Sequence, residues 1–226
     1  MSAFEGIFRW TGGAVFTGAL AFCAYTFAVV WSRDAEFRAA AIATDALLFT
    51  IFAVHHSVFA REPVKRRIAR LVPDDLLRSS YVWIASLLLI SVCGLWLAVG
   101  GEVYDVGGWR SAVHAGVQVA GLLLIADAVR KIDALELAGI REHHKQEPLQ
   151  ITGPYRLVRH PIYLGWLLAT FGPAHMTTDR LLFAGISALY LVVAMPIEER
   201  GLRREFGETY TRYAERVRWR VVPYIY

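Results

Sequence analysis

Long apolar blocks dominate the pattern of hydrophobic and polar positions along the chain. Four windows carry few or no formal charges and are long enough to cross the hydrocarbon core of a bilayer. A fifth, shorter window contains Gly172-Pro173, and only a short polar stretch separates it from a sixth. We therefore predict four transmembrane helices followed by a helical hairpin. The windows lie at 12–31, 40–60, 81–99 and 112–129, with the hairpin at 162–176 and 181–197.

This pattern predicts an all-α fold, a polytopic transmembrane helix bundle, in two parts. Residues 1–130 hold the four spans, whereas residues 131–226 combine a charged segment, the hairpin and a charged tail. We expect the segment 131–150 to extend the fourth helix and then become a loop. In the tail, apolar residues recur at helical spacing, so we expect an amphipathic helix that Gly207 interrupts and Pro223 ends. These residues are Leu202, Phe206, Tyr210, Tyr213 and Val217.

Charge indicates the orientation. If both termini lie in the cytoplasm, 20 of the 24 Lys and Arg residues fall on the cytoplasmic side, as the positive-inside rule requires. The basic balance therefore reflects contact with a lipid bilayer, and we expect no nucleic-acid partner. The composition fits a bacterial inner membrane protein, and nothing in the sequence assigns an oligomeric state. The first apolar window lies far from a basic segment, so we expect no cleaved signal peptide.

A basic and aromatic loop precedes the hairpin. Arg156, Arg159 and His160 come directly before Pro161, which suits the first turn of a helix. Helix N-termini favour a carboxylate or phosphate ligand. Gly165, one turn later, would allow close approach of a planar ring or a neighbouring backbone. The structural alternative is an interfacial anchor, because membrane boundaries collect Arg, His, Tyr and Trp.

Two adjacent carboxylates, Glu198 and Glu199, follow the last apolar window. They oppose the charge favoured at a helix C-terminus and lie near a region of low dielectric. Such groups need a cation, which could be a ligand's ammonium or sulfonium. The structural alternative is pairing with Arg159, Arg200 or Arg203.

Together these stretches resemble the superfamily of isoprenylcysteine carboxyl methyltransferases and phospholipid N-methyltransferases. The resemblance covers roughly residues 150–226 and rests on four elements in order. They are Arg159-His160-Pro161-Ile162-Tyr163-Leu164-Gly165, Glu198-Glu199, Phe206-Gly207-Glu208-Thr209-Tyr210-Thr211-Arg212-Tyr213 and Pro223.

The resemblance implies a membrane-embedded methyltransferase that binds S-adenosyl-L-methionine at the cytoplasmic face of its C-terminal part. No Gly-rich fingerprint of a soluble nucleotide fold is present in the sequence. The resemblance also implies site residues. Those for the cofactor are Tyr155, Arg159, His160, Pro161, Tyr163, Gly165, Glu198 and Glu199, and those for the substrate are Arg61, Arg203, Tyr210 and Tyr213. No metal site is expected.

A second segment refines the resemblance. Phe52-Ala53-Val54-His55-His56-Ser57-Val58-Phe59-Ala60-Arg61, followed by Arg78-Ser79-Ser80-Tyr81-Val82, is similar to the bacterial methanethiol S-methyltransferases, which usually carry Gln at the position of His55. His titrates near neutrality, so His55 and His56 are candidate catalytic groups. Glu199 is the third candidate catalytic group. The alternative for both histidines is a hydrogen-bonded interfacial role.

The acceptor is expected to be small or lipophilic, with a thiol favoured. Eukaryotic isoprenylcysteine enzymes carry an Arg shortly before the glutamates, whereas residues 191–196 here include Ala194 and no charge. A carboxylate acceptor would lack that partner. An isoprenylcysteine carboxyl or phospholipid amine methyltransferase remains an alternative. A second alternative is a haem-binding membrane protein related to carotene isomerases, with ligands from His55, His56 and His114.

Overall fold

The computed structural model describes residues 3–33, 35–59, 61–141 and 148–226. Within these ranges five helices are long and apolar enough to cross a membrane. The expectation of an all-α, polytopic membrane protein is therefore confirmed. The five segments are Ala3–Val30, Ala39–Phe59, Leu76–Gly94, Trp109–Arg130 and Thr178–Phe206. The adjacent histidines His143 and His144 belong to the segment 142–147, which lies outside the described residues.

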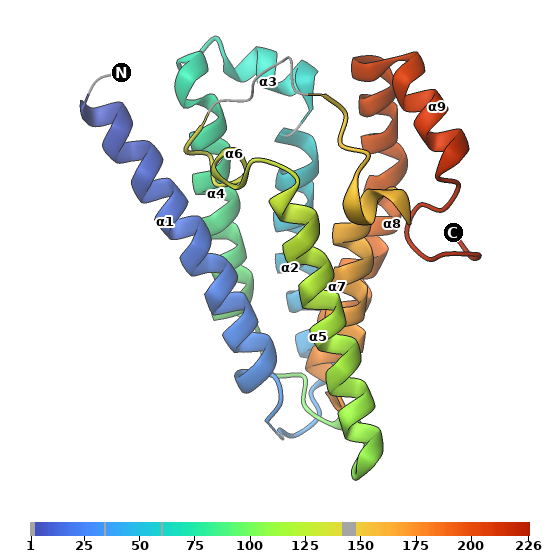
Figure 1. The fold of residues 1–226 in the computed structure, drawn as a ribbon. Coiled ribbons are helices and arrows are strands. Elements are labelled where there is room, and N and C mark those ends of the chain that lie inside the picture. The colour runs from blue at the N-terminus through green and yellow to red at the C-terminus, as the bar shows by residue number, and fades with distance from the viewer. Residues whose placement is uncertain (1–2, 34, 60, 142–147) are drawn as a thin grey trace. The chain divides into compact units, whose positions relative to one another are not determined.

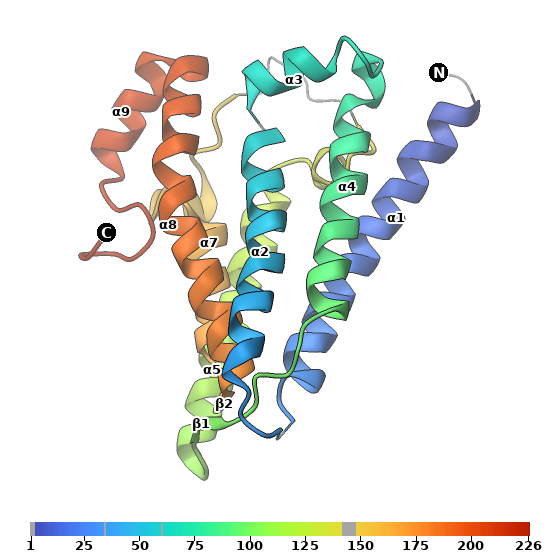
Figure 2. The same ribbon diagram turned by 180° about the vertical axis from the view of Figure 1, so that it is seen from behind.

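The chain forms two compact units, residues 1–101 with 134–145 (unit 1) and residues 102–133 with 146–226 (unit 2). Unit 1 contains mainly helices, and α3 links α2 to α4 across one end of both (Figures 1 and 2). Its elements are α1 (Ala3–Tyr25), the π-helical turn η1 (Thr26–Val30), α2 (Ala39–Phe59), α3 (Glu62–Ile68), α4 (Asp74–Gly94) and α6 (Ala134–Leu137).

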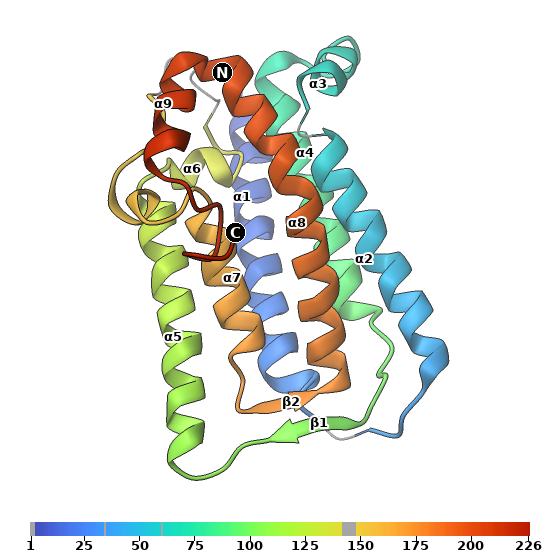
Figure 3. The same ribbon diagram turned by 90° about the vertical axis from the view of Figure 1, so that its right-hand side faces the viewer.

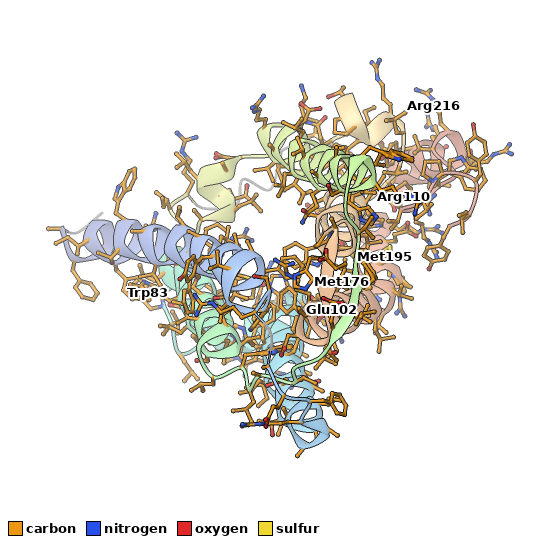
Figure 4. The ribbon with its side chains drawn as sticks, turned by 90° about the horizontal axis from the view of Figure 1, so that it is seen from below. Trp83, Glu102, Arg110, Met176, Met195 and Arg216 are labelled. Atoms are coloured by element: carbon orange, nitrogen blue, oxygen red, sulfur yellow. The ribbon has the colours of Figure 1, made fainter. Side chains whose placement is uncertain are left out.

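Helices α1 and α4 pack side by side over much of their length. The Trp83 indole nitrogen on α4 donates a hydrogen bond of 3.0 Å to the Phe8 carbonyl on α1, and Figure 4 shows Trp83 beside that helix. A Cβ atom at Gly12 would lie 2.7 Å from the Trp83 ring, so a glycine is needed where the indole crosses α1. One glycine and one indole thus set the spacing of the pair.

The expected span at 81–99 lies earlier in the chain, because α4 begins at Asp74 and ends at Gly94. The apolar residues that follow are not helical. The Leu97 amide donates to the buried carboxylate of Asp45, and the Arg38 amide donates to the Val99 carbonyl. Hydrogen bonds to other segments satisfy this backbone without a helix. The apolar pattern alone therefore placed the end of the helix too late in the chain.

Unit 2 is centred on α5 and α7, which pack closely through facing glycines. A Cβ atom at Gly121 would lie 2.6 Å from the Gly165 carbonyl oxygen, and a Cβ atom at Gly165 would lie 2.6 Å from the Gly121 carbonyl oxygen. Small residues at such a crossing let two membrane helices approach. The elements of unit 2 are β1 (Glu102–Asp105), α5 (Trp109–Arg130), η2 (Gly153–Arg156), α7 (Pro161–Phe171), β2 (His175–Thr177), α8 (Thr178–Phe206) and α9 (Glu208–Arg216).

The expected hairpin is present as α7, β2 and α8. At 1.5 Å per residue the 11 residues of α7 cover about 16 Å, roughly half of a hydrocarbon core. The chain then continues into β2, which pairs antiparallel with β1 (Figure 3). The first arm of the hairpin is therefore a short helix with an extended end.

Two expected helix ends differ from the structure. Helix α5 ends at Arg130 in a tight turn and does not extend into the charged segment 131–150. In the tail, α8 continues without a break to Phe206, Gly207 turns the chain at φ 54°, and α9 ends at Arg216, well before Pro223. The apolar residues of the predicted stripe do meet, although they lie on α8, on α9 and just beyond it: Tyr210, Tyr213 and Val217 form a buried cluster against which Leu202 and Phe206 pack.

Candidate functional site

The site in unit 2 is organised around the buried carboxylate of Glu199 on α8. Arg159 Nε donates a hydrogen bond of 2.7 Å to Glu199 Oε1, and Arg220 Nε lies 3.2 Å from Oε2. Glu199 is only 3% exposed. A carboxylate taken out of water is tolerated only with such partners. Both oxygens of Glu199 are therefore held by guanidinium groups.

The same arginine joins the loop before α7 to the C-terminal tail. Arg159 Nη1 donates to the carbonyl oxygens of Val217 and Arg218, each at 2.8 Å. The backbone amides of Arg159 and His160 donate to the carbonyls of Trp219 and Arg220 at 2.9 and 2.8 Å. The tail is thus fixed by main-chain bonds, and these bring Arg220 to Glu199. Burial lowers the pKa of Arg220, but the charge of Glu199 outweighs it and the pKa is raised.

Glu198, the neighbouring carboxylate, has a different environment. Its side chain is 47% exposed. The Tyr163 hydroxyl on α7 donates a hydrogen bond of 2.6 Å to its Oε2, and His160 Nδ1 lies 3.8 Å from the same oxygen. The rings of His160 and Tyr163 are stacked at 5.1 Å. Glu198 is therefore an accessible acceptor at the edge of an aromatic pair.

Two buried polar atoms lie beside these carboxylates. His160 is 6% exposed and Tyr210 is 1% exposed. His160 Nε2 is 3.4 Å from Glu199 Oε1. Among the described residues neither this nitrogen nor the Tyr210 hydroxyl has a hydrogen-bond partner of suitable geometry. Such atoms are costly to bury and are suited to receive a polar ligand.

Three tyrosines line the region around the glutamates. The Tyr213 hydroxyl donates a hydrogen bond of 2.8 Å to the Tyr155 carbonyl, which ties α9 to η2. Burial, and then the charge of Glu198, raise the pKa of Tyr155 to about 12. Burial, and then Glu199, raise the pKa of Tyr210 to about 12, and burial raises that of Tyr213 as well. All three phenols are neutral donors at physiological pH.

The remaining predicted residues of unit 2 are placed as follows. Pro161 is the first residue of α7, with His160 directly before it, as the sequence predicted. The guanidinium of Arg203 lies 6.0 Å from the ring centroid of Tyr210. Gly165 faces Gly121, so its small size has a packing role between α5 and α7.

His55, His56 and Arg61 belong to unit 1. His56 Nδ1 lies 2.8 Å from the Tyr81 hydroxyl, and the side chain faces a cavity of about 450 Å³. His55 is 8% exposed and stacks on Phe59 and Tyr81 at 4.6 and 5.6 Å. Arg61 is exposed and directly precedes α3. The structure thus brings His56 to Tyr81, and it brings His160 to the two glutamates.

The haem-binding alternative gains no support from these positions. His114 belongs to unit 2, and its Nδ1 is hydrogen-bonded to the Gly172 carbonyl at 3.0 Å. In the part of the chain that the structure describes, no three His, Cys, Asp or Glu side chains form a metal-binding group.

Arg220 is the one charged partner of Glu199 that sequence reasoning missed. Arg159 was among the expected partners of the glutamates, whereas Arg200 and Arg203 are not bonded to Glu199. The only signal for Arg220 was the excess of arginine in the tail. That signal could not select one arginine, because the tail beyond Arg216 is not helical.

Comparison with known proteins agrees with this arrangement. The chain is 36% identical to methanethiol S-methyltransferase 2 of Bradyrhizobium diazoefficiens over 185 residues, covering 78% of this chain and 71% of the relative. It is 31% identical to methanethiol S-methyltransferase of Crocosphaera subtropica over 203 residues, covering 86% and 79%. It is also 30% identical to nurim of Rattus norvegicus over 181 residues, covering 73% and 69%.

No family model and no solved structure matches the chain. The similarity to the methanethiol S-methyltransferases nevertheless extends through most of both chains at more than 30% identity. It therefore includes parts of both unit 1 and unit 2. The chain belongs to the family of integral membrane methyltransferases that contains the methanethiol S-methyltransferases.

Proposed function

We propose that this protein transfers a methyl group from S-adenosyl-L-methionine to a small or lipophilic thiol. The observation that carries the proposal is the asymmetric glutamate pair. Glu199 is neutralised by Arg159 and Arg220, whereas the neighbouring Glu198 is accessible and retains capacity to accept hydrogen bonds. A site with one accessible carboxylate suits a cationic ligand.

The residues of unit 2 fit this methyl donor. Glu198 would meet the ammonium group, because a half-exposed carboxylate attracts a cation without the full cost of burial. The buried His160 Nε2 and Tyr210 hydroxyl are suited to the polar groups of the donor. Tyr163 and Tyr155 complete the neutral, aromatic part of the site. When bound, the donor supplies an electrophilic methyl group on a sulfonium.

The protein's own contribution is positioning and exclusion of water. Methyl transfer needs the acceptor aligned with the methyl group and the leaving sulfur, and correct placement supplies much of the rate gain. Arg159 and Arg220 hold Glu199, and Glu199 in turn fixes α8 against the loop and the tail. We infer that this ion-paired group keeps Glu198 and His160 in place during the reaction.

A thiol is the favoured acceptor for a physical reason and for a comparative one. Thiolates are strong nucleophiles, so a modest reduction of the thiol pKa or removal of its proton is sufficient. The segment 191–196 has no charged residue that could hold a carboxylate acceptor. Relatives that cover most of the chain carry the name methanethiol S-methyltransferase. Methylation of a prenylcysteine carboxylate or a phospholipid amine is the alternative, and the nurim similarity fits it.

His55 and His56 remain our candidates for removing the thiol proton. When His56 Nδ1–H donates to the Tyr81 oxygen, Nε2 carries no hydrogen and is the ring nitrogen that would take the proton. Which nitrogen carries hydrogen depends on the direction of that bond. Arg61 and Arg203 are retained as substrate-binding candidates.

We further propose that both termini and the glutamate site face the cytoplasm of a bacterial cell. The partition of Lys and Arg along the whole sequence supports this orientation. Single cysteines introduced into the segment 61–73, which contains α3, and into the tail should react with an impermeant maleimide only after the membrane is opened. Labelling of either segment in intact cells would reverse the orientation.

The activity is tested by calorimetry with S-adenosylhomocysteine on detergent-purified protein, followed by an acceptor assay with a labelled methyl donor. The acceptors are methanethiol, longer alkyl thiols, a prenylcysteine and phosphatidylethanolamine. We expect binding of S-adenosylhomocysteine and turnover of thiols, with Glu198→Gln weakening binding. Turnover of the prenylcysteine with thiols inert would overturn the thiol assignment, and absence of binding would overturn the cofactor.

A further inference from the structure

The cavity of unit 1 is much larger than a small thiol requires. Its volume of about 450 Å³ lies within the range of about 300–1,000 Å³ that is typical of sites for drug-sized ligands. Methanethiol has only two non-hydrogen atoms. The cavity therefore has room for a molecule much larger than methanethiol.

Charge is concentrated at one end of this cavity. Lys65 on α3 and Arg78 near the start of α4 both line it, together with His56 near the end of α2. Among the residues whose side chains the structure describes, none that lines the cavity is a carboxylate. The end of the cavity beneath α3 is thus cationic, and it is suited to an anionic group.

The rest of the cavity is mainly apolar, with Ser80, Tyr81 and Ser86 as its polar lining residues. Along α4 the lining extends from Arg78 to Leu89, and 11 residues of helix correspond to about 16 Å of depth. Phe16 and Leu20 of α1 and Phe52 of α2 complete the apolar part. These helices are all long enough to cross a membrane. The cavity therefore has a basic end and an apolar depth, which is the polarity of a lipid.

We propose that this cavity binds an anionic glycerophospholipid, with its phosphate at Lys65 and Arg78 and one acyl chain between α1, α2 and α4. A phosphate is the anionic group that basic residues at a membrane boundary bind, and an acyl chain matches the apolar walls. Arg78 is held for this role, since its Nε donates a hydrogen bond of 3.1 Å to the Glu136 carbonyl. The proposal does not depend on the methyl-transfer reaction.

The test uses native mass spectrometry of the full chain with dioleoylphosphatidylglycerol and, separately, dioleoylphosphatidylcholine. The two lipids have the same acyl chains and differ in net charge. We expect the anionic lipid to be retained at least fivefold more strongly. Equal retention of both lipids would overturn the assignment of an anionic head group.

Helix α3 offers a matched control for the charge. Lys65→Gln and Arg66→Gln remove the same charge from adjacent positions, but Arg66 is exposed and does not line the cavity. We expect Lys65→Gln to lower retention of the anionic lipid at least threefold and Arg66→Gln to leave it unchanged. Equal losses from both variants would show attraction to the surface only and would contradict the proposal.

A third variant tests the apolar depth. Ala85 lines the cavity, so Ala85→Phe directs a ring into its volume. We expect this variant to lose the lipid while it keeps its affinity for S-adenosylhomocysteine, which also reports that the protein is folded. If Ala85→Phe does not fold, the comparison of Lys65→Gln with Arg66→Gln decides the matter. Unchanged retention in a folded Ala85→Phe protein would place the lipid elsewhere.

Discussion

Two helix ends of this protein hold ionisable residues in opposite ways. Glu199, toward the end of α8 in unit 2, is 3% exposed and has both oxygens bonded to guanidinium groups. His56, toward the end of α2 in unit 1, faces an apolar cavity and contacts the Tyr81 hydroxyl. The first arrangement holds α8, the loop before α7 and the C-terminal tail in one geometry. The second leaves a side chain directed at space that a ligand can enter.

This contrast indicates that the two regions have different roles. A buried ion-paired network is rigid, because loss of one member leaves an uncompensated charge. An apolar cavity tolerates different occupants, because its contacts are not directional. We expect variants of the Glu199 network to act on folding and cofactor affinity, and variants of the cavity to act on acceptor or lipid.

The largest effect is expected for Glu199→Gln. Removal of the carboxylate leaves the buried Arg159 without its anion, which should cost about 3–5 kcal/mol of stability. Thermal unfolding in detergent measures it. Glu208→Gln is the control, because its exposed pair with Arg212 should contribute less than about 0.5 kcal/mol. A loss for Glu199→Gln as small as that of the control would show that the network is not structural.

The next effect concerns His56→Gln in unit 1. If His56 removes the thiol proton, kcat should fall about 100-fold at neutral pH. The deficit should shrink as the pH approaches the pKa of the thiol, which then ionises unaided. Affinity for S-adenosylhomocysteine should not change. A uniform deficit at all pH values, or a loss of cofactor affinity, would assign His56 a structural role.

A smaller effect is expected for His160→Ala in unit 2. We expect at least about tenfold weaker binding of S-adenosylhomocysteine by a folded protein, because His160 presents a buried nitrogen beside both glutamates. Calorimetry measures the affinity. His175→Ala is the control, since His175 lies on β2 and pairs with Glu102. Near-normal affinity of His160→Ala would indicate that the loop before α7 is only an interfacial anchor.

The sequence predicted the class of fold and the family, but not the details that distinguish the two regions. Apolar windows identify helices in lipid because backbone groups must be satisfied internally. The same criterion failed at residues 95–99, which are apolar but not helical. Here the Leu97 amide donates to the Asp45 carboxylate, and the Val99 carbonyl accepts from the Arg38 amide.

The sequence likewise predicted only part of the candidate site. The need of two carboxylates for a cation follows from charge alone, and it correctly included Arg159. The difference between Glu198 and Glu199 did not follow, because it depends on the position of Arg220. That position is set by main-chain bonds between the tail and the loop before α7, which no periodicity encodes.

The smallest effect is expected for Tyr210→Phe, and it tests whether the hydroxyl is buried beside Glu199. The buried hydroxyl lacks a hydrogen-bond partner of suitable geometry among the described residues, so its removal should not lower the free energy of unfolding at neutral pH. The pKa of Tyr210 is about 12 in the folded protein and about 10 when unfolded. Between these values the unfolded chain loses the proton first, so the folded state loses stability as pH rises, by at most about 1.4 kcal/mol per pH unit. Tyr210→Phe should therefore show a shallower fall than the parent protein above pH 10, with identical unfolding below it. Parallel curves through pH 12 would mean that Tyr210 ionises equally in both states and is not buried beside Glu199.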